Sequence, residues 1–178
     1  MQRSRLIFLA VMLATIAAGT IAYGQQPPAS PPGTASVTFA DGKTVTIAYS
    51  RPYVKGRKIF GGLVPYGEVW RTGANAATSL KTDMDLTIGG TAVPAGSYTL
   101  YTIPNESGWN LIINKQTGQW GTNYDEKLDL GRVDMKVSKN ASPTEQFTIS
   151  FDKTGANAAT LKLDWANTTA SVSVAEKK

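Results

Sequence analysis

The sequence predicts an all-β protein: an antiparallel β-sandwich of Ig-like or jelly-roll-like type, with little helix. Apolar and polar residues alternate along most of the chain from residue 36 onward. Short turns rich in Gly, Asn, Asp and Pro separate these runs at close spacing, which is typical of sandwiches and barrels. Since each run is apolar on one face only, its strand has a core on one side and water on the other, as in an antiparallel sheet.

The N-terminus has the order of features found in a secretory signal peptide. Arg3 and Arg5 precede an apolar run over residues 6–18, and Ala22-Tyr23-Gly24 forms a small-x-small cleavage signal. We therefore predict a signal peptide at residues 1–24 and a periplasmic or secreted protein. The alternative is an uncleaved membrane anchor, because the whole apolar stretch approaches the length that spans a bilayer.

The rest of the chain is expected to form one domain. Residues 25–34 are rich in Pro and predict an extended linker. Residues 35–175 suit a single β-sandwich domain with one core. Without the two leader arginines, 18 basic residues become 16 against 13 acidic ones, so the net charge falls from +5 to +3. This mild charge and the export signal argue against nucleic acid as a partner, and no membrane association is expected after signal cleavage.

The predicted strands follow in order, each with its apolar residues in phase. They cover residues 36–39, 45–49, 86–88, 98–103, 109–113, 133–137, 147–151, 161–165 and 172–174. Asp41-Gly42 lies between the first two and predicts a hairpin with a type I′ turn, which needs positive φ at both central residues. Gly89-Gly90 predicts a second tight turn, and residues 105–108 a third. Helix is expected only as a turn or two within 51–72 or near 124–130.

One seven-residue string occurs twice. TGANAAT covers residues 72–78 and again 154–160, each time ahead of a Leu-Lys pair. Because Gly-Ala-Asn supports a tight corner that tolerates left-handed backbone, we predict that both copies make the same turn into a strand. The alternative is a duplicated half-domain, although the sequences that flank the two copies do not match.

Cysteine and histidine are both absent. Their absence excludes a Cys nucleophile, a Ser-His-Asp triad and metal sites built on thiolate or imidazole. Carboxylate acid/base chemistry, Ser-Lys or Tyr-assisted chemistry, hard cations held by oxygens, and plain binding stay open. No motif assigns a catalytic residue, and no cofactor or metal is expected.

Residues 51–78 form a long stretch that does not alternate. The stretch combines glycines and aromatic residues with five basic residues against one acid. As a ligand surface, it would provide guanidinium forks for carboxylates or phosphates and aromatic faces for sugars. The candidate binding residues are Arg51, Arg57, Tyr66, Trp70 and Arg71. At least two of these arginines are then expected to converge with Tyr66 or Tyr124 on one concave patch.

The same stretch also suits a structural role, as a strap over the open end or edge of the sandwich. In that case its large apolar residues would fill the core; these are Ile59, Phe60, Leu63, Val64 and Trp70. Arg71 would then pair with Glu68 or with a backbone carbonyl. The two interpretations make opposite predictions, because a guanidinium that is satisfied by protein acceptors cannot bind a ligand.

Residues 116–131 are a second candidate for binding. Trp120 and Tyr124 could stack a sugar, and the Asp, Asn and Glu oxygens could hold calcium, although their spacing is not that of an EF-hand. The alternative is a long surface hairpin loop with one anchoring Trp.

Two runs of the sequence are similar to domain-of-unknown-function family 2911: RPYVKGRKIFGGLVPYGEVWRTGANAAT at residues 51–78 and PAGSYTLYTIP at residues 94–104. Further residues of that family's pattern are Trp109, Asn114-Lys115, Trp120-Gly121 and Tyr124. The resemblance covers roughly residues 35–174. It implies a compact β-rich domain of exported bacterial proteins, and it brings no activity and no site residues with it.

These observations favour non-catalytic binding in the bacterial cell envelope, with a glycan, a small anion or an envelope protein as the partner. One alternative is a carboxylate-dependent hydrolase acting on sugars, which needs two carboxylates about 5 to 9.5 Å apart. Glu68 with Asp125 or Glu126 is the pairing near both unusual stretches. The other alternative is a purely structural envelope module, which predicts that the whole of residues 51–78 is buried.

Overall fold

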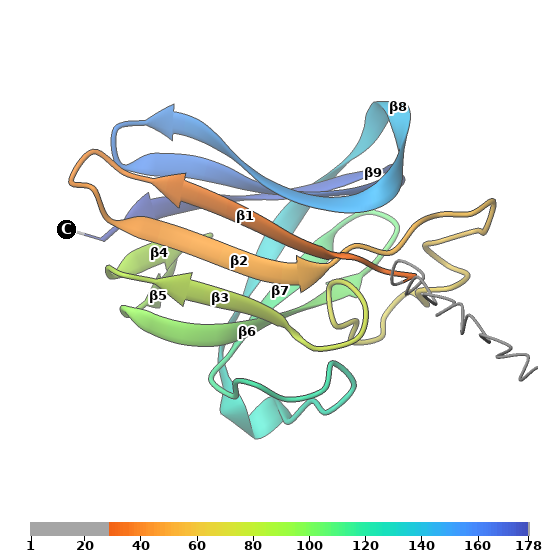
Figure 1. The fold of residues 1–178 in the computed structure, drawn as a ribbon, viewed down its shortest axis with the longest axis horizontal. Helices are drawn as coiled ribbons and strands as arrows, with labels where there is room; N and C mark the ends of the chain where they lie inside the picture. Colours follow the sequence, from red (N-terminus) through yellow and green to blue (C-terminus); the bar gives the residue numbers. More distant parts are fainter. Residues whose placement is uncertain (1–28, 178) are drawn as a thin grey trace, which may run out of the picture.

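The computed structural model describes residues 29–177, and these residues form an all-β fold (Figure 1). The strands are β1 (Pro32–Thr38), β2 (Thr44–Ser50), β3 (Thr78–Thr82), β4 (Leu86–Ile88), β5 (Thr91–Val93), β6 (Gly96–Pro104), β7 (Trp109–Asn114), β8 (Asp129–Gly155) and β9 (Ala158–Glu176). Every paired strand runs antiparallel to its neighbour, so the predicted antiparallel all-β class is confirmed.

The strands form one sheet in the order β1-β2-β3-β6-β7-β8-β9-β4-β5, and this sheet is not closed. An Ig-like or jelly-roll sandwich has two separate sheets, whereas here β8 belongs to both halves. Residues 129–135 of β8 pair with β7, and the strand pairs with β9 from Lys136 onward. Register shifts after Lys139 allow β8 to bend. The sheet therefore curls back on itself until β8 lies beside β1 (Figure 1).

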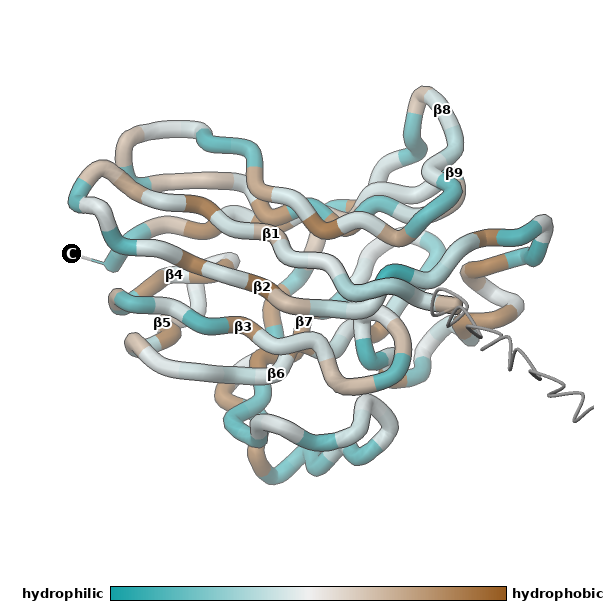
Figure 2. Tube along the Cα trace, in the orientation of Figure 1, coloured by the Kyte–Doolittle hydropathy of each residue, from teal (hydrophilic) through white to brown (hydrophobic). Residues whose placement is uncertain are grey.

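The core fills the inside of this curled sheet. Alternate residues of each strand are buried, as Val45 and Ile47 are on β2 and Leu161 and Leu163 are on β9. Figure 2 shows the same alternation along β2, where apolar residues are separated by more polar ones. Five aromatic side chains pack together in this core: Phe60, Trp70, Trp109, Phe147 and Trp165. Phe60 and Trp70 come from the stretch that does not alternate.

The predicted turns are present, and one differs in type. Gly89 and Gly90 have φ of 53° and 91° between β4 and β5, as a type I′ turn requires. Asp41-Gly42 connects β1 and β2, so that hairpin is confirmed. Only Gly42 of the pair has positive φ, and its N–H donates to the Phe39 carbonyl at 3.0 Å. The connection is therefore a longer loop that ends in a left-handed glycine, and the type I′ prediction is wrong.

Helix is limited to one short turn in the part of the chain that the structure describes. This is the 3-10 turn η1 (Glu126–Leu128), which lies where a turn of helix was predicted. Residues 29–177 contain no helix long and apolar enough to cross a membrane. The predicted signal peptide at residues 1–24, and its membrane-anchor alternative, lie outside the described residues. β1 begins at Pro32, so the sheet includes the last residues of the range expected as a linker.

The two copies of TGANAAT do not make the same turn, so that prediction is wrong. In the first copy, Thr72, Gly73 and Asn75 have φ of 53°, 154° and 59°, whereas no residue of the second copy has positive φ. The second copy is the hairpin between β8 and β9, where Gly155 pairs with Ala158. Tertiary contacts explain the difference, because the buried Thr72 hydroxyl donates to Thr102 Oγ1 at 3.2 Å in the first copy.

Candidate functional site

Residues 51–78, hereafter the strap, cross one end of the sheet. Backbone hydrogen bonds fix the strap at both sides: Val54 N–H donates to the Glu145 carbonyl at 2.8 Å, and Trp70 N–H donates to the Thr102 carbonyl at 2.7 Å. Ile59, Phe60 and Val64 are buried, as the structural interpretation predicts.

Leu63 does not follow that prediction, because it is 50% exposed. The chain turns back at Gly61-Gly62, where the N–H groups of Leu63 and Val64 donate to the carbonyls of Lys58 and Ile59. This turn places Val64 inside and its neighbour Leu63 outside. The outer side of the strap is therefore accessible to a ligand.

The three candidate arginines of the strap have three different environments. Arg51 is paired internally, because its Nε donates to the Phe147 carbonyl at 3.2 Å and its Nη2 to Thr148 Oγ1 at 3.1 Å. Arg57 is exposed, and its side chain folds back onto the preceding backbone. Its Nε donates to the Val54 carbonyl at 3.0 Å and its Nη2 to the Tyr53 carbonyl at 2.5 Å.

Arg71 is the exception. Within residues 29–177, its Nε is buried without a hydrogen-bond partner, and no carboxylate lies within ion-pair distance of its guanidinium. The predicted pairing of Arg71 with Glu68 or a backbone carbonyl does not occur at Nε. A buried donor that lacks an acceptor costs about 1–3 kcal/mol, and more when it is charged.

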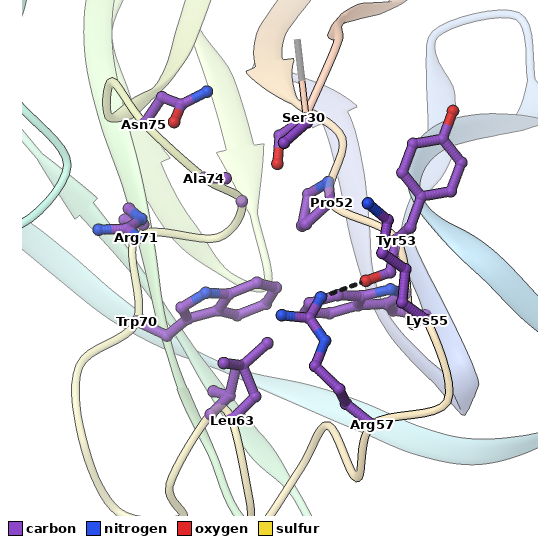
Figure 3. A pocket seen from close by; sticks show the side chains of 14 residues that line it. Ser30, Pro52, Tyr53, Lys55, Arg57, Leu63, Trp70, Arg71, Ala74 and Asn75 are labelled. Carbon is purple, nitrogen blue, oxygen red and sulfur yellow. Dashed lines mark hydrogen bonds between the residues drawn. The ribbon is translucent and has the colours of Figure 1, made fainter.

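A pocket of about 380 Å³ opens beside Trp70, and we call it the indole pocket (Figure 3). Its lining comprises Ala29, Ser30, Pro52, Tyr53, Lys55, Arg57, Leu63, Val64, Trp70, Arg71, Gly73, Ala74, Asn75 and Trp165. The indoles of Trp70 and Trp165 are nearly parallel, with ring centroids 5.7 Å apart and planes 14° apart. The volume falls within the range of about 300–1,000 Å³ that is usual for small-molecule sites.

The indole pocket is electropositive. Lys55, Arg57 and Arg71 line it, and no Asp or Glu does. Figure 3 shows the Arg57 guanidinium near the centre of the view and Arg71 on the opposite side of Trp70. Trp165 adds a second unsatisfied donor, because its Nε1 is buried without a hydrogen-bond partner and the residue is 2% exposed. Two unpaired N–H groups thus belong to residues of one pocket.

Residues 116–131, hereafter the Trp120 loop, lie against the strap. Ala77 N–H donates to the Gln119 carbonyl at 3.3 Å, and Gly121 N–H donates to the Asn75 carbonyl at 3.1 Å. Trp120 itself is 55% exposed, so it does not anchor the loop as the surface-hairpin interpretation proposed. Contact between these two stretches is a requirement of the predicted convergence of the strap's arginines with Tyr124.

Tyr124 is the anchored aromatic residue of the Trp120 loop. Its hydroxyl donates to Asp129 Oδ2 at 2.7 Å and accepts from Arg132 Nη2 at 2.9 Å, and its ring meets Tyr101 edge to face at 4.9 Å. Burial raises the pKa of Tyr124 to about 12, and the hydrogen bond to Asp129 adds to this effect. Arg132, which follows the loop, also donates to Glu126 Oε1 at 2.7 Å and to Asp129 Oδ2 at 3.0 Å, so it pairs with two acids of this loop.

A second pocket, of about 440 Å³, lies between the strap and the Trp120 loop, and we call it the tyrosine pocket. It is lined by Val69, Trp70, Arg71, Tyr101, Gly121, Thr122 and Tyr124. Trp70 and Arg71 line both pockets. No Asp or Glu lines the tyrosine pocket either.

The structure therefore brings some of the predicted binding residues together and separates others. Arg57, Trp70 and Arg71 share the indole pocket, whereas Tyr124 lies in the tyrosine pocket with Trp70 and Arg71. Tyr66 lines a different groove together with Arg57. Arg51 and Trp120 line neither the indole pocket nor the tyrosine pocket.

Trp165 and Tyr101 were not predicted as site residues. Trp165 lies in phase with Leu161 and Leu163, and this position indicates a core residue. Tyr101 follows Leu100 on β6 and is out of phase with the core residues of that strand. A large aromatic residue on the outer face of a sheet indicates that another segment covers that face. The position of Tyr101, out of phase with the core residues, is therefore the feature of the sequence that could have identified it.

The catalytic and metal alternatives find no matching cluster in the described part of the chain. Neither principal pocket contains a carboxylate. Asp125 caps η1 by accepting from Lys127 N–H at 3.0 Å, and Glu126 pairs with Arg132. No group of three or more Asp or Glu residues within 29–177 is arranged to hold a metal ion.

Comparison with known proteins gives one match. A family model described as "Protein of unknown function (DUF2911)" matches residues 30–174. Comparison with curated proteins and with solved structures gave no match. The family model covers most of the chain, including the strap, the Trp120 loop and every residue that lines the two pockets except Ala29, and so this protein belongs to the DUF2911 family of proteins of unknown function.

Proposed function

We propose that this protein is a non-catalytic binding module of the bacterial cell envelope, and that it holds an acidic sugar in the indole pocket. The observation that carries the proposal is the state of Arg71. Its cationic side chain lines the pocket, and its buried Nε has no acceptor within residues 29–177. A ligand carboxylate would supply acceptor oxygens in the planar geometry that a guanidinium prefers.

The aromatic residues of the pocket favour a sugar over a simple inorganic anion. Trp70 is partly exposed and is supported by the nearly parallel, buried indole of Trp165, so its face can pack against the C–H face of a pyranose ring. The unpaired Trp165 Nε1 is a further donor for a hydroxyl or carboxylate oxygen. Lys55 and Arg57 add positive charge without a carboxylate in the lining to offset it.

Backbone strain is concentrated at the same place. Four non-glycine residues within 29–177 have positive φ: Lys55, Thr72, Asn75 and Ala166. Lys55 and Asn75 line the indole pocket, Thr72 follows Arg71, and Ala166 follows Trp165. Such conformations cost about 1–3 kcal/mol each and cluster at binding and catalytic sites, so they support a functional role for this end of the sheet.

The two alternatives from the sequence have less support. A sugar hydrolase would need two carboxylates facing one cleft, and neither pocket offers even one. A purely structural module would bury and pair the whole strap, whereas Leu63 is exposed and Arg71 Nε is unpaired. The envelope location rests on the leader-like N-terminus, which is a sequence observation alone.

Calorimetric titration of the full chain with galacturonic acid tests the proposal, with galactose as the uncharged comparison. We expect galacturonic acid to bind at least about ten times more tightly than galactose, since a hydrogen bond to a charged group contributes about 1.5–3 kcal/mol. Arg71→Gln should remove that difference. Lys81→Gln, which changes an exposed charge on β3 away from both pockets, is the matched control and should keep it.

Equal affinity for the two sugars, or no binding of either, would contradict the proposed function. Retention of full galacturonic acid affinity in Arg71→Gln would show that the charge is recognised elsewhere. A measurement of sugar reducing ends after prolonged incubation with galacturonic acid oligomers would reveal hydrolysis, if it occurs, and would then favour the enzyme alternative.

A further inference from the structure

The indole pocket and the tyrosine pocket share a wall. Trp70 and Arg71 line both, and the two volumes, about 380 and 440 Å³, are similar. One side chain with an unsatisfied donor, Arg71 Nε, therefore lies at the junction of two cavities. A ligand confined to either pocket would leave the other unused.

The position of Arg71 at this junction follows from Gly121. A Cβ added to Gly121 would lie 2.4 Å from Arg71 Cδ and 3.0 Å from Arg71 Cβ, so the side-chain stem passes directly over this glycine. Gly121 itself lines the tyrosine pocket. In Figure 3, Arg71 lies at the edge of the indole pocket, beyond Trp70 as seen from Arg57. The guanidinium is thus carried by a stem that runs along the tyrosine pocket.

The walls of the tyrosine pocket are fixed by the protein itself. Tyr124 is held by Asp129 and Arg132, and Tyr101 Oη donates to the Asn123 carbonyl at 3.2 Å. The two hydrogen bonds between residues 75–77 and residues 119–121 hold the strap and the loop together. A preformed site loses little conformational entropy when a ligand binds.

Electrostatics are favourable over both pockets. Neither lining contains a carboxylate, and Asp129, which accepts from Tyr124, is neutralised by Arg132 at 3.0 Å. The Tyr124 hydroxyl is occupied by these two partners, so the ring is available to a ligand mainly through its apolar surface. The tyrosine pocket therefore suits the face of a sugar whose acid group reaches Arg71.

We infer that the ligand is an acidic oligosaccharide, with neighbouring units in the indole pocket and the tyrosine pocket and an acid group bound to Arg71 between them. The inference rests on the proposed function and adds the length of the ligand. Its physical basis is that a second unit joined covalently to the first binds at a high effective concentration. Affinity should then rise steeply from one unit to several.

The test compares galacturonic acid with its linear trimer on the full chain by calorimetry. We expect the trimer to bind at least about ten times more tightly than the monomer, because linkage makes binding of the second sugar unit intramolecular. Thr122→Glu places a negative charge in the tyrosine pocket alone, since Thr122 is exposed and lines only that cavity of the two. This variant should lose the trimer's advantage over the monomer.

Thr117→Glu is the matched control, because Thr117 is exposed on the same loop and lines neither pocket. It should retain the advantage of the trimer. Monomer and trimer binding within about threefold of each other would overturn the two-pocket inference while the proposed function stands. An advantage that survives Thr122→Glu would also overturn it. Tripolyphosphate binding as tightly as the trimer would show that charge alone is recognised, and failure of every sugar to bind would end both proposals.

Discussion

The strap and the Trp120 loop are in contact, but Arg71 of the strap and Arg132, which follows the loop, have opposite environments, and so do the tryptophans of the two stretches. Next to the loop, Arg132 donates to Asp129, Glu126 and Tyr124 at 2.7 to 3.0 Å. In the strap, Arg71 has a buried Nε with no partner in the described chain. The loop exposes its Trp120, whereas the strap packs Trp70 against four aromatic residues of the core.

This difference shows that residue type alone does not distinguish a binding site from a structural segment. Both stretches contain Trp, Tyr, Gly and at least one basic residue, and both are predicted candidates. The hydrogen bonds separate them. Arg132 is satisfied by Asp129, Glu126 and Tyr124 of the loop, and a satisfied guanidinium cannot bind a ligand, whereas Arg71 Nε has no partner within residues 29–177. In the proposed site, the loop therefore forms a wall, and the strap supplies the binding group.

The largest expected effect distinguishes the two tryptophans. Trp70→Ala should lower the free energy of unfolding by about 3 kcal/mol, at the low end of the range for truncating a large aromatic residue, since Trp70 is only half buried. Trp120→Ala should change it by less than about 0.5 kcal/mol, as is usual for an exposed side chain. Denaturant unfolding measures both. Similar losses in the two variants would show that the loop tryptophan is also structural.

A smaller loss of unfolding free energy is expected from a substitution at the contact between the strap and the Trp120 loop. A Cβ at Gly121 would lie 2.7 Å from the Asn75 carbonyl oxygen, which is backbone and cannot move aside easily. Gly121→Ala should therefore cost about 1–3 kcal/mol of unfolding free energy, the usual cost of overpacking. Thr122→Ala, at the next and exposed position, is the control and should cost little. An unchanged stability in Gly121→Ala would mean that the strap and the loop are held together only loosely.

Substitution of Arg132 or Arg71 should change the free energy of unfolding by less than Gly121→Ala does. Arg132→Gln breaks partly exposed ion pairs, so it should cost up to about 1 kcal/mol. Arg71→Gln removes a buried unpaired charged donor and should be neutral or slightly stabilising in the absence of ligand. If Arg71→Gln proves more destabilising than Arg132→Gln under the same denaturant conditions, Arg71 has a structural role that the hydrogen bonds do not reveal.

The smallest effect concerns alkaline pH. Folding raises the pKa of Tyr124 from 10.0 to about 12, chiefly through burial. The protonated hydroxyl therefore contributes stability that is fully present below pH 10 and is lost as the pH rises toward 12. The difference in unfolding free energy between the unchanged protein and Tyr124→Phe should shrink over this interval. A difference that stays constant from pH 9 to pH 12 would contradict the assigned pKa.

Local signals were sufficient for much of the fold. The hairpin at Asp41-Gly42, the turn at Gly89-Gly90 and the helical turn near residues 124–130 all depend on residues adjacent in sequence. β3 was missed because its core-facing positions are Thr78, Leu80 and Thr82, so it has no apolar alternation. Its threonines are buried with their hydroxyls satisfied; for example, Thr82 Oγ1 donates to the Met84 carbonyl at 2.6 Å.

The candidate site was predicted only in part, for a similar reason. The arginines and Trp70 belong to one unusual stretch and were recognisable from composition. Trp165 comes from β9, roughly a hundred residues away in sequence, and only the curl of the sheet brings it beside Trp70. The two TGANAAT copies show the same limit, since identical residues adopt different backbone conformations under different tertiary contacts.

The most direct test of ligand binding through Arg71 is nuclear magnetic resonance of the arginine Nε–Hε groups in the ¹⁵N-labelled full chain. Galacturonic acid is added until the spectrum no longer changes. We predict that the Arg71 Nε–H signal, assigned by its loss in Arg71→Gln, shifts on addition of the sugar. The signals of Arg51 and Arg132, which already have protein acceptors, should stay in place. An Arg71 signal that does not move at saturating sugar would contradict the central claim.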